Sequence, residues 1–475
     1  MNLFFFLTTP LTAIQNKIAL LFIIFFLAFL VSGKPGHANE PPIALSLEQA
    51  IATALTKNRS IINAQHSVNS AKLNLSTARS DFDIKVRPFA GGGITDGNQN
   101  FNSGLNFSKN FQYGMQVSLS PYISKGDTDY GTAAGVSLEI PLFKYFGKLV
   151  NTQNIKSSEF SIRSSERALV QTKENIVLET VTSFYHIIEQ KKNVAMNQLL
   201  VEKFKRHTAI AQIKTDVGLA QPLDVYRAQI KEKDAAVSLT DSLERLQTAY
   251  NNLKSILSIP QNRKIALLDT PVKSTATELD INKIEAIAFE NSIEIKSALD
   301  TLNEKKRSSK IAEHYLLPDL TVFFDYTRSG NGNNFDNDVF RLSEESWRVY
   351  LTSSSDFART SEKNSYRQSL ITVQSSELDL ANKKDQLGKE VKNQVDFLEK
   401  SRERMVILEQ QIQKAMGKFE LSRIKFNNGM ADNFDMIEAE TELHRAQLNH
   451  LSAQINHITG TYRLRKTIGT LIEYN

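Results

Sequence analysis

The stretch "IKTDVGLAQPLDV", residues 213–225, returns in altered form as "IKFNNGMADNFDM", residues 424–436. In both stretches a glycine follows the lysine by four positions, and an aspartate follows the glycine by six. The two glycines, Gly218 and Gly429, are 211 positions apart in a chain of 475 residues. A turn that recurs at nearly half the chain length indicates an internal duplication rather than a solenoid, whose repeats span about 20–50 residues.

Each stretch has the chemistry of a tight turn between two helices. Gly218 and Gly429 stand just beyond a helix-like segment, where glycine adopts a positive φ without strain. Gln221 and Asp432 follow at the N-cap position of the next helix, for which aspartate is the better residue. Pro222 begins the helix after the first tip, where a backbone N–H would have no partner within the helix. Asp224 and Asp435 lie in the first turns of the two helices, where a negative charge is favoured by the positive end of the helix dipole. We therefore interpret both stretches as the tips of helical hairpins.

The segments that lead into the tips have the periodicity of long coiled-coil helices. Residues 148–217 lack glycine and proline, and apolar residues recur there every seven positions: Ile155, Ile162, Leu169 and Ile176. As one helix this segment would be ~105 Å long. Residues 358–428 repeat the pattern with Val391, Leu398, Met405, Ile412 and Phe419. The returning helices are expected over residues 222–258 and 433–471.

The blocks that precede the two rods also resemble each other. Residues 45–81 and 281–318 are both helix-like, and we align Ile51 with Ile284, Asn58 with Asn291, and Ile62 with Ile295. Each block is followed by segments in which apolar residues alternate with small or polar ones, which is the period of a β-strand. The order helix, strands, long helix, turn, helix thus occurs twice. The sequence predicts a first repeat over residues 39–270 and a second over 271–475.

The strands pose a closure problem that one copy of the chain does not solve. We expect membrane strands at residues 86–93, 136–141, 319–328 and 347–353, and the alternation in "FNSGLNFS" (101–108) and "MQVSLS" (115–120) predicts strands there as well. These are too few to close a barrel, and the edges of an open sheet leave backbone groups unsatisfied, which lipid does not tolerate. Several copies could close one barrel together. The alternation of apolar with small or polar residues suits a wall with lipid outside and water inside.

The first forty residues predict export. Lys17 precedes an apolar run over residues 18–31, and Gly36 and Ala38 are small residues at the positions that a signal peptidase reads. The run is shorter than the roughly 20 residues that a membrane-spanning helix needs. We expect a signal peptide over residues 1–38, cleaved after Ala38. The alternative is an uncleaved anchor, because residues 3–7 ahead of Lys17 are apolar as well.

Composition and motifs argue against several classes of function. The formal charge of +5 is too small for nucleic-acid binding, which needs a dense cationic face. The absence of cysteine excludes disulfides, thiolate metal sites and lipidation of an N-terminal cysteine. The eight histidines are scattered, and "GGG" at residues 91–93 precedes a strand rather than a helix. We therefore expect no catalytic residues, no metal and no cofactor.

Together, the duplicated layout, "VGLAQPLDV" (217–225), "NNGMADNFDM" (427–436) and "EIPLFKYFGK" (139–148) resemble the TolC-type outer-membrane efflux proteins of Gram-negative bacteria. The resemblance covers essentially the whole mature chain. It implies a mainly α-helical homotrimer, in which each protomer gives four strands to a shared 12-stranded membrane β-barrel and two coiled-coil hairpins to a periplasmic tunnel. Residues 331–345 would then form a loop outside the cell.

The same resemblance implies a function and its partners. The trimer would be the outer-membrane exit channel of a tripartite efflux pump or a type I secretion system. Its partners would be a periplasmic adaptor (membrane fusion) protein, an inner-membrane RND or ABC transporter, and outer-membrane lipid, with no nucleic acid. The sequence does not determine whether drugs, metals or polypeptides pass. An alternative is a periplasmic or surface coiled-coil structural protein without a pore; an enzyme is disfavoured.

Two sets of site residues follow from the family's pattern. The residues expected to dock with the adaptor are those of the two tips: Gly218, Leu219, Ala220, Gly429, Met430 and Ala431. Asp435 and Glu438 match the two acidic positions that line the periplasmic entrance, and Asp224 matches a position that helps latch it shut. The usual latch partners appear here as Phe426 and Ala431, which offer neither hydroxyl nor guanidinium. We therefore expect an acidic constriction with a different or looser latch.

Two further departures from the family concern the strands. Residues 86–141 hold enough material for more than two strands, which allows elongated or extra extracellular segments. The second repeat has "TSSSDFART" (352–360) where the first has "IPLFKYFGK" (140–148), and the absence of proline and glycine there predicts a smoother joint between strand and helix.

Overall fold

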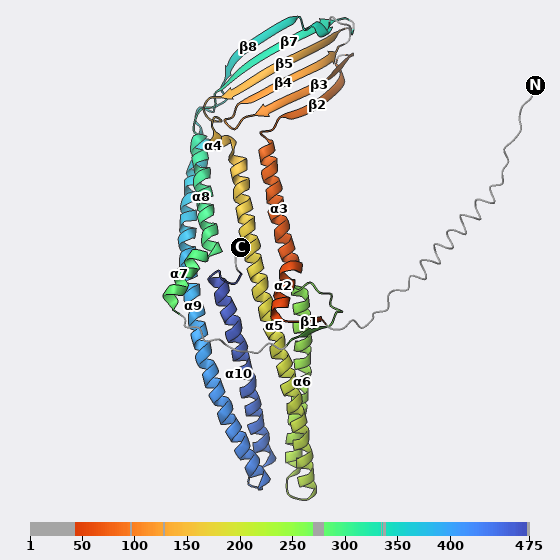
Figure 1. Cartoon of the computed structure of the whole chain (residues 1–475), viewed down its shortest axis with the longest axis vertical. Helices are drawn as coiled ribbons and strands as arrows, with labels where there is room; N and C mark the ends of the chain where they lie inside the picture. Colours follow the sequence, from red (N-terminus) through yellow and green to blue (C-terminus); the bar gives the residue numbers. More distant parts are fainter. Residues whose placement is uncertain are drawn as a thin grey trace, which may run out of the picture.

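The chain forms a long helical shaft that carries a β-sheet at one end and two hairpin tips at the other (Figure 1). This computed structural model describes residues 43–472 except 96, 127–128, 269–279, 334 and 336–338. The predicted signal peptide (1–38) and the predicted repeat boundary at 270/271 lie outside the described residues. None of the described helices is both long enough and apolar enough to cross a membrane.

Four long helices build the shaft, as the heptad pattern predicts. They are α5 (Gln153–Asp216), α6 (Pro222–Ile256), α9 (Thr360–Asn427) and α10 (Asn433–Thr467). The 64 residues of α5 span ~96 Å at about 1.5 Å per residue. The first rod is not a single helix, because a four-residue helix, α4 (Lys148–Asn151), precedes it and Thr152 separates the two.

The two blocks predicted as single helices are each broken once. The first divides into α2 (Leu47–Lys57) and α3 (Arg59–Ser80), and the second into α7 (Ile281–Asn291) and α8 (Ile293–His314). At the first break, the side-chain oxygen of buried Asn58 accepts the Ser60 N–H at 2.8 Å, while its amide donates to the Ile256 carbonyl at 2.8 Å. Ser292 occupies the second break and accepts the Ile295 N–H at 3.2 Å.

These breaks correct the alignment of the repeats by one residue. The helices α2 and α7 are both 11 residues long and start 234 positions apart (47 to 281). Asn58 therefore corresponds to Ser292 rather than to Asn291, and Ile51 and Ile62 do not correspond to Ile284 and Ile295. The fully buried pair Ala54 and Ala288 has the 234-residue spacing. The sequence alignment was wrong by one residue because identical residue types, such as Asn58 and Asn291, lie one position away from the structural match.

The largest core lies at mid-height, where the broken helices meet the shaft. It packs α2 and α3 against α5, α6 and the end of α10, around the fully buried side chains of Phe184, Ile187, Leu253 and Leu257. Tyr185 is buried there as well, which agrees with its interpretation as a packing residue. Two short strands, β1 (Ile43–Leu45) and β6 (Ile265–Leu267), pair in parallel beside this core.

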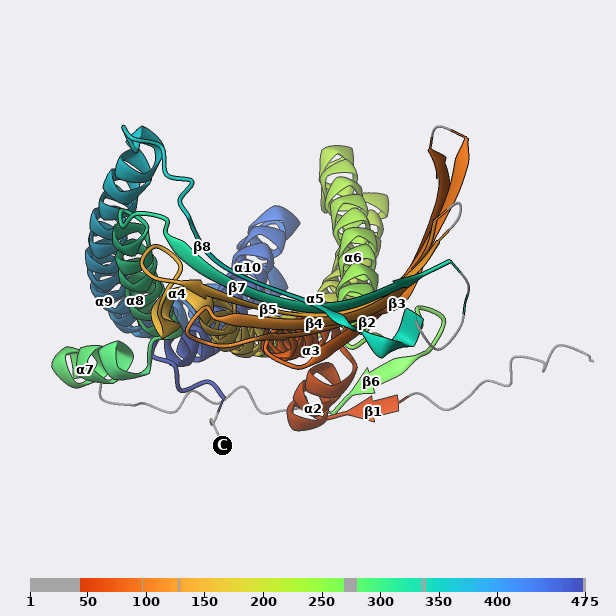
Figure 2. The ribbon, with the colours of Figure 1, turned by 90° about the horizontal axis from the view of Figure 1, so that it is seen from above.

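The sheet at the top of the shaft has six antiparallel strands in the order β2-β3-β4-β5-β7-β8 and is strongly curved (Figure 2). Four of them overlap the predicted membrane strands: β2 (Lys85–Thr95), β5 (Tyr130–Pro141), β7 (Thr321–Gly332) and β8 (Glu344–Thr352). The other two, β3 (Asn98–Asn110) and β4 (Gln116–Lys125), form a hairpin between β2 and β5. The expectation of four strands per protomer is therefore wrong, because the sheet of one chain has six.

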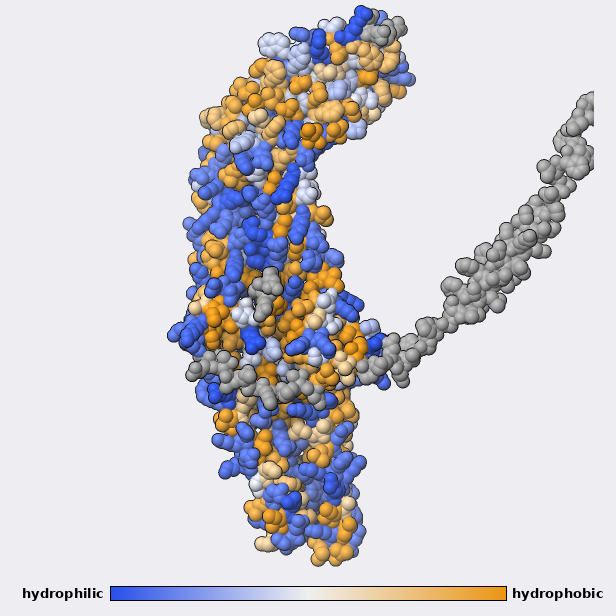
Figure 3. Space-filling model, viewed as in Figure 1, coloured by the Kyte–Doolittle hydropathy of each residue, from blue (hydrophilic) through white to orange (hydrophobic). Residues whose placement is uncertain are grey.

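The two faces of the sheet differ sharply in polarity. One register row of directly paired residues crosses all six strands and is apolar: Val86, Phe107, Leu119, Val136, Tyr326 and Trp347. The next row points to the opposite face and is polar: Lys85, Ser108, Ser118, Ser137, Asp325 and Arg348. A broad hydrophobic band marks the sheet in the space-filling view, whereas the shaft below it is mostly hydrophilic (Figure 3).

The joints between sheet and shaft are both tightly held. After β5, the backbone N–H groups of Leu142 and Lys144 donate to the carbonyls of Leu320 and Pro318 at 2.8 and 3.1 Å. After β8, Arg359 turns the chain with a left-handed φ of 51°, and its guanidinium donates to the Leu316 carbonyl. The prediction of a smoother second joint is therefore wrong, because the chain turns sharply at Arg359 without a glycine or a proline.

Candidate functional site at the hairpin tips

Both tips have the backbone that their glycines predict. Gly218 and Gly429 have φ values of 78° and 71°, and each lies directly after the last turn of a long helix. At each tip a backbone N–H beyond the glycine closes the turn: Leu219 donates to the Lys214 carbonyl at 2.7 Å, and Met430 to the Lys425 carbonyl at 2.8 Å. The two tips lie together at the end of the shaft farthest from the sheet (Figure 1).

The predicted docking residues form the outermost surface of these tips. The side chains of Leu219 and Met430 are 78% and 74% exposed, which is unusual for large apolar residues. Ala220 and Ala431 are half-buried and line a cavity of about 530 Å³ between the two tips. Asp224 and Phe426 line the same cavity. Of the six predicted docking residues, all but Gly218 therefore line this cavity: Leu219, Ala220, Gly429, Met430 and Ala431.

The two first-turn aspartates play different parts. Asp432 caps α10 by accepting the Asp435 N–H at 2.9 Å, as predicted, so the carboxylate of Asp435 is not needed for the cap and is exposed. In the first tip the hydrogen bond runs the other way, from the N-cap backbone to the side chain of the first-turn aspartate. Asp224 itself accepts the Gln221 N–H at 3.2 Å, and its other oxygen lies 3.8 Å from Arg227. Asp224 is thus tied to its own helix.

Glu438 is exposed one turn beyond Asp435 on α10. Lys418 on α9 lies near enough to both acids for their charges to contribute to raising its pKa, although its hydrogen bond to Glu442 has the largest effect. The two predicted gate acids therefore lie on one exposed stretch of α10, while Asp224 faces the cavity between the tips.

A buried ionic cluster that the sequence analysis missed joins the two hairpins above the tips. Glu440 on α10 is 3% exposed; its two oxygens lie 2.6 Å from Lys203 Nζ and 2.9 Å from His207 Nε2, both on α5. Burial acts to raise the pKa of Glu440, but the hydrogen bonds from His207 and Lys203 outweigh it and hold the pKa below its ordinary value. Asn433 adds a bond from its amide to the His207 carbonyl at 3.2 Å.

Three cation–π contacts also connect the hairpins. Lys214 Nζ on α5 lies 3.8 Å from the ring centroid of Phe426 on α9, and Phe426 is buried. Lys203 of α5 approaches Phe419 of α9 at 5.5 Å, and Arg227 of α6 approaches Phe434 of α10 at 5.6 Å. Such contacts contribute about 0.5–2 kcal/mol each, depending on desolvation. The spacing of Phe419, Phe426 and Phe434 by seven and eight residues is the only signal in the sequence that could have suggested this row.

Neither the tips nor the rest of the described chain has the groups of a metal site. Among the described residues, no group of three or more His, Asp or Glu side chains is arranged to hold a metal ion. The Glu440 cluster and the cation–π contacts lie between helices of the two hairpins, where they can hold the hairpins together or release them.

Known proteins match this architecture along almost the whole chain. A profile of the outer membrane efflux protein family matches residues 50–258 and 287–470. The outer membrane protein TolC of Vibrio cholerae is 20% identical over 323 residues, covering 67% of this chain and 73% of that protein. Among solved structures, VceC of Vibrio cholerae superposes with a TM-score of 0.70 at 14% identity, covering 89% of this chain and 96% of that one.

A second solved structure, the CmeC outer membrane channel of Campylobacter jejuni, superposes with a TM-score of 0.69 at 14% identity, covering 90% of this chain and 86% of that one. The fold, the duplicated helical hairpins and the profile match over both repeats agree. The comparisons give no support to a structural protein without a pore. The chain belongs to the outer membrane efflux protein family, and is an outer-membrane channel protein with a periplasmic helical tunnel.

Proposed function

We propose that three copies of the chain form a passive exit duct of a tripartite efflux pump or a type I secretion system. The observation that carries the proposal is the division of the molecule: a sheet with one apolar face lies at one end of a shaft that is ~96 Å long, and two tips with exposed apolar side chains lie at the other. Each end offers a surface that a single chain leaves uncovered.

The sheet end requires other copies of the chain. Strands β2 and β8 are the edges of the sheet, and edge backbone groups in lipid need partners. Copies arranged around a common axis satisfy every edge and place the apolar face toward lipid. The polar face then surrounds a water-filled path that continues into the helical shaft.

The tip end suits a partner with a similar helical hairpin. Leu219 and Met430 extend from turns whose glycines leave open space, so another small turn can approach the backbone closely. We assign the partner as a periplasmic adaptor, which links the duct to an inner-membrane transporter of the RND or ABC class. The transporter would supply the energy and choose the class of cargo that enters the duct.

The gate is proposed from the same end of the molecule. Asp435 and Glu438 of three copies would give six carboxylates around the entrance. In place of the missing latch partners, the Lys214–Phe426 contact and the Glu440 cluster hold the hairpins of one chain together. Opening would require the second hairpin to move away from the first.

The test is topology in a Gram-negative host. An epitope inserted near Asn334, which lies outside the described residues between β7 and β8, should be accessible on intact cells. A matched epitope inserted after Gly218 should become accessible only when the outer membrane is permeabilised. Chemical cross-linking of the outer-membrane fraction should give trimers. Accessibility of both epitopes on intact cells, or cross-linked species no larger than a monomer, contradicts the proposal.

A further inference from the structure

We propose that the β3–β4 hairpin is part of the membrane wall, and that three copies close an 18-stranded barrel by pairing β2 of one copy with β8 of the next. The proposal rests on the trimer proposed above and concerns the size and lining of its outer-membrane segment. It follows from six strands per chain rather than four.

The hairpin is fully integrated into the sheet. Strand β3 pairs with β2 from Lys85↔Ser108 to Thr95↔Asn98, and β4 pairs with β5 from Gln116↔Glu139 to Lys125↔Tyr130. With 13 and 10 residues, β3 and β4 are each long enough to cross a bilayer, for which a tilted strand needs roughly 9–11 residues. Excluding the hairpin from the barrel would break both ladders.

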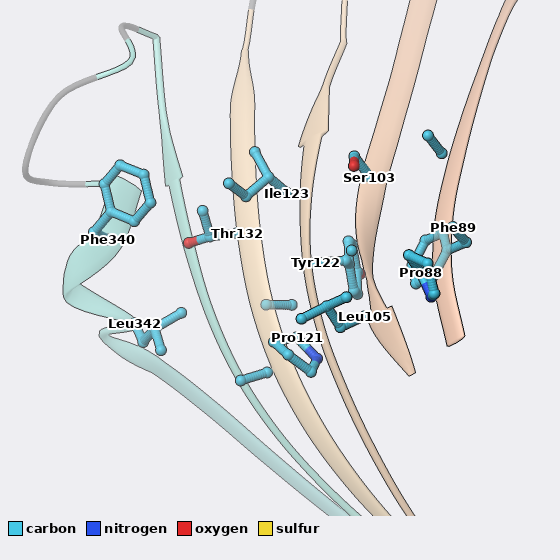
Figure 4. A pocket seen from close by; sticks show the side chains of 14 residues that line it. Pro88, Phe89, Ser103, Leu105, Pro121, Tyr122, Ile123, Thr132, Phe340 and Leu342 are labelled. Carbon is cyan, nitrogen blue, oxygen red and sulfur yellow. The ribbon is translucent and has the colours of Figure 1, made fainter. Parts of the chain in front are cut away.

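The hairpin also carries the polarity of a membrane strand pair. Phe107 and Leu119 continue the apolar row between Val86 and Val136, and Ser108 and Ser118 continue the polar row on the opposite face. A hairpin exposed to water on both faces would have no reason to keep this alternation. Near the far end of the strands, Phe340 and Leu342 lie over the face that carries Leu105 and Pro121 (Figure 4).

The turn of the hairpin is fastened to the base of the sheet. The Tyr113 carbonyl accepts the Gly147 N–H at 3.0 Å, just before α4, and the Asn110 amide donates to the Asp81 carbonyl at 3.1 Å, just after α3. Lys109 donates to the Phe82 carbonyl beside it. The turn therefore lies where sheet meets shaft and not among the loops at the outer end.

Closure by three copies follows from the strand order. Six strands is an even number, so β8 of one copy and β2 of the next run antiparallel, as every other pair in the sheet does. Barrel diameter grows with strand number, and 16–18-stranded barrels leave an aqueous channel. The charged residues of the polar face balance: Lys85, Arg87 and Arg348 against Glu139, Asp325 and Glu344. The outer-membrane segment is thus a wide, electrically neutral opening, and selection by size or charge occurs at the tips.

The test uses single cysteines, which are unambiguous because the chain has none. Ser118→Cys and Leu119→Cys are neighbours on β4 that point to opposite faces. Ser137→Cys and Val136→Cys are their register partners on β5 and serve as matched controls. In outer membranes treated with a membrane-impermeant maleimide, Ser118→Cys should react and Leu119→Cys should not, at least a tenfold difference in rate. The β5 pair should behave in the same way.

The outcomes separate this proposal from the proposed function. If the β5 pair alternates but both β4 cysteines react equally, the hairpin lies outside the wall and the 18-stranded barrel is wrong, while the duct stands. If neither pair alternates, the sheet is not in the membrane and the proposed function fails with it.

A second measurement tests the seam between copies. Val86→Cys on β2 combined with Leu351→Cys on β8 should give disulfide-linked trimers on oxidation. The control combines Leu351→Cys with Phe107→Cys, one strand further in, and should leave monomers. Linked dimers without trimers from the Val86 and Leu351 pair would overturn closure by three copies, as would a count of twelve strands in an electron cryo-microscopy map of the native assembly.

Discussion

At Gly218 and Gly429, positive φ and open surroundings occur together: an added Cβ would meet no other atom within 4 Å. Substitution is therefore opposed by backbone conformation and not by crowding within the chain. Gly417 in α9 has equally open surroundings but lies inside the helix. Gly417 and Gly429 are therefore a matched pair of sites on the second hairpin, and of the two only Gly429 has a positive φ.

We predict that Gly218→Val and Gly429→Val abolish export while assembly in the outer membrane continues. A β-branched residue at positive φ costs about 1–3 kcal/mol, which deforms the tip, and it adds bulk where an adaptor would approach. The measurement is export activity together with the amount of cross-linked trimer. Gly417→Ala should leave both unchanged. Full activity in the two valine variants would exclude docking at the tips.

The Glu440 cluster predicts a second effect at single-residue scale. Glu440→Gln removes the charge that compensates Lys203 and weakens the hydrogen bond with His207, and should lower the free energy of unfolding by about 1–3 kcal/mol at neutral pH. Glu442→Gln removes an acid two residues further on whose pair with Lys418 is exposed, and should change stability by less than about 1 kcal/mol. Thermal unfolding measures both. Equal effects would show that burial of the cluster contributes nothing.

The same cluster fixes the sign of a pH dependence. The pKa of Glu440 is lowered in the folded chain, so its stabilisation is complete above the unfolded pKa, about 4.3, and is lost as pH falls through the lower folded value. The difference in melting temperature between wild type and Glu440→Gln should therefore be full at pH 7 and shrink below about pH 4. A difference that grows as pH falls would contradict this assignment.

At the scale of elements, the sequence predicted what local patterns determine. Heptads located the four shaft helices within a few residues, because apolar spacing and the tip glycines are read locally. The break at Asn58 was missed because its amide partner, the Ile256 carbonyl, is 198 residues away. The inter-hairpin contacts were missed for the same reason. Nothing in the sequence near Lys214 or Phe426 predicts their contact, which forms only because α5 packs beside α9.

The Lys214–Phe426 contact predicts how firmly the two hairpins stay closed. Lys214→Met keeps the length of the side chain and removes the charge, and should raise single-channel conductance or the time spent open, because a cation–π contact is lost in each copy. Lys214→Arg keeps a cation that stacks on the ring and should behave like wild type. Planar-bilayer recording provides the measurement. If the two variants conduct alike, the contact does not hold the entrance.

At the scale of the whole molecule, the duplicated order of elements correctly predicted the architecture. The main error was the number of strands in the sheet of one chain, which is six rather than four. The alternation in residues 98–125 was visible in the sequence, but the family resemblance supplied only four strands. Whether an alternating segment lies in the wall depends on its register with β2 and β5, which involves pairs up to 23 residues apart. Periodicity predicts a strand without predicting its neighbours.

The last prediction also belongs to the whole assembly, since no single chain can form a ring. Asp435 and Glu438 are exposed on α10, and threefold symmetry would bring six carboxylates around a narrow entrance. Because the proposed barrel lining is neutral, this ring should dominate charge selection, attracting cations with a strength that salt reduces. Asp435→Asn combined with Glu438→Gln should abolish cation selectivity and block by multivalent cations in planar bilayers. Asp216→Asn removes an acid near the first tip, outside the proposed ring, and should change neither. An equal loss of selectivity in Asp216→Asn, or none in the double variant, would show that the ring lies elsewhere.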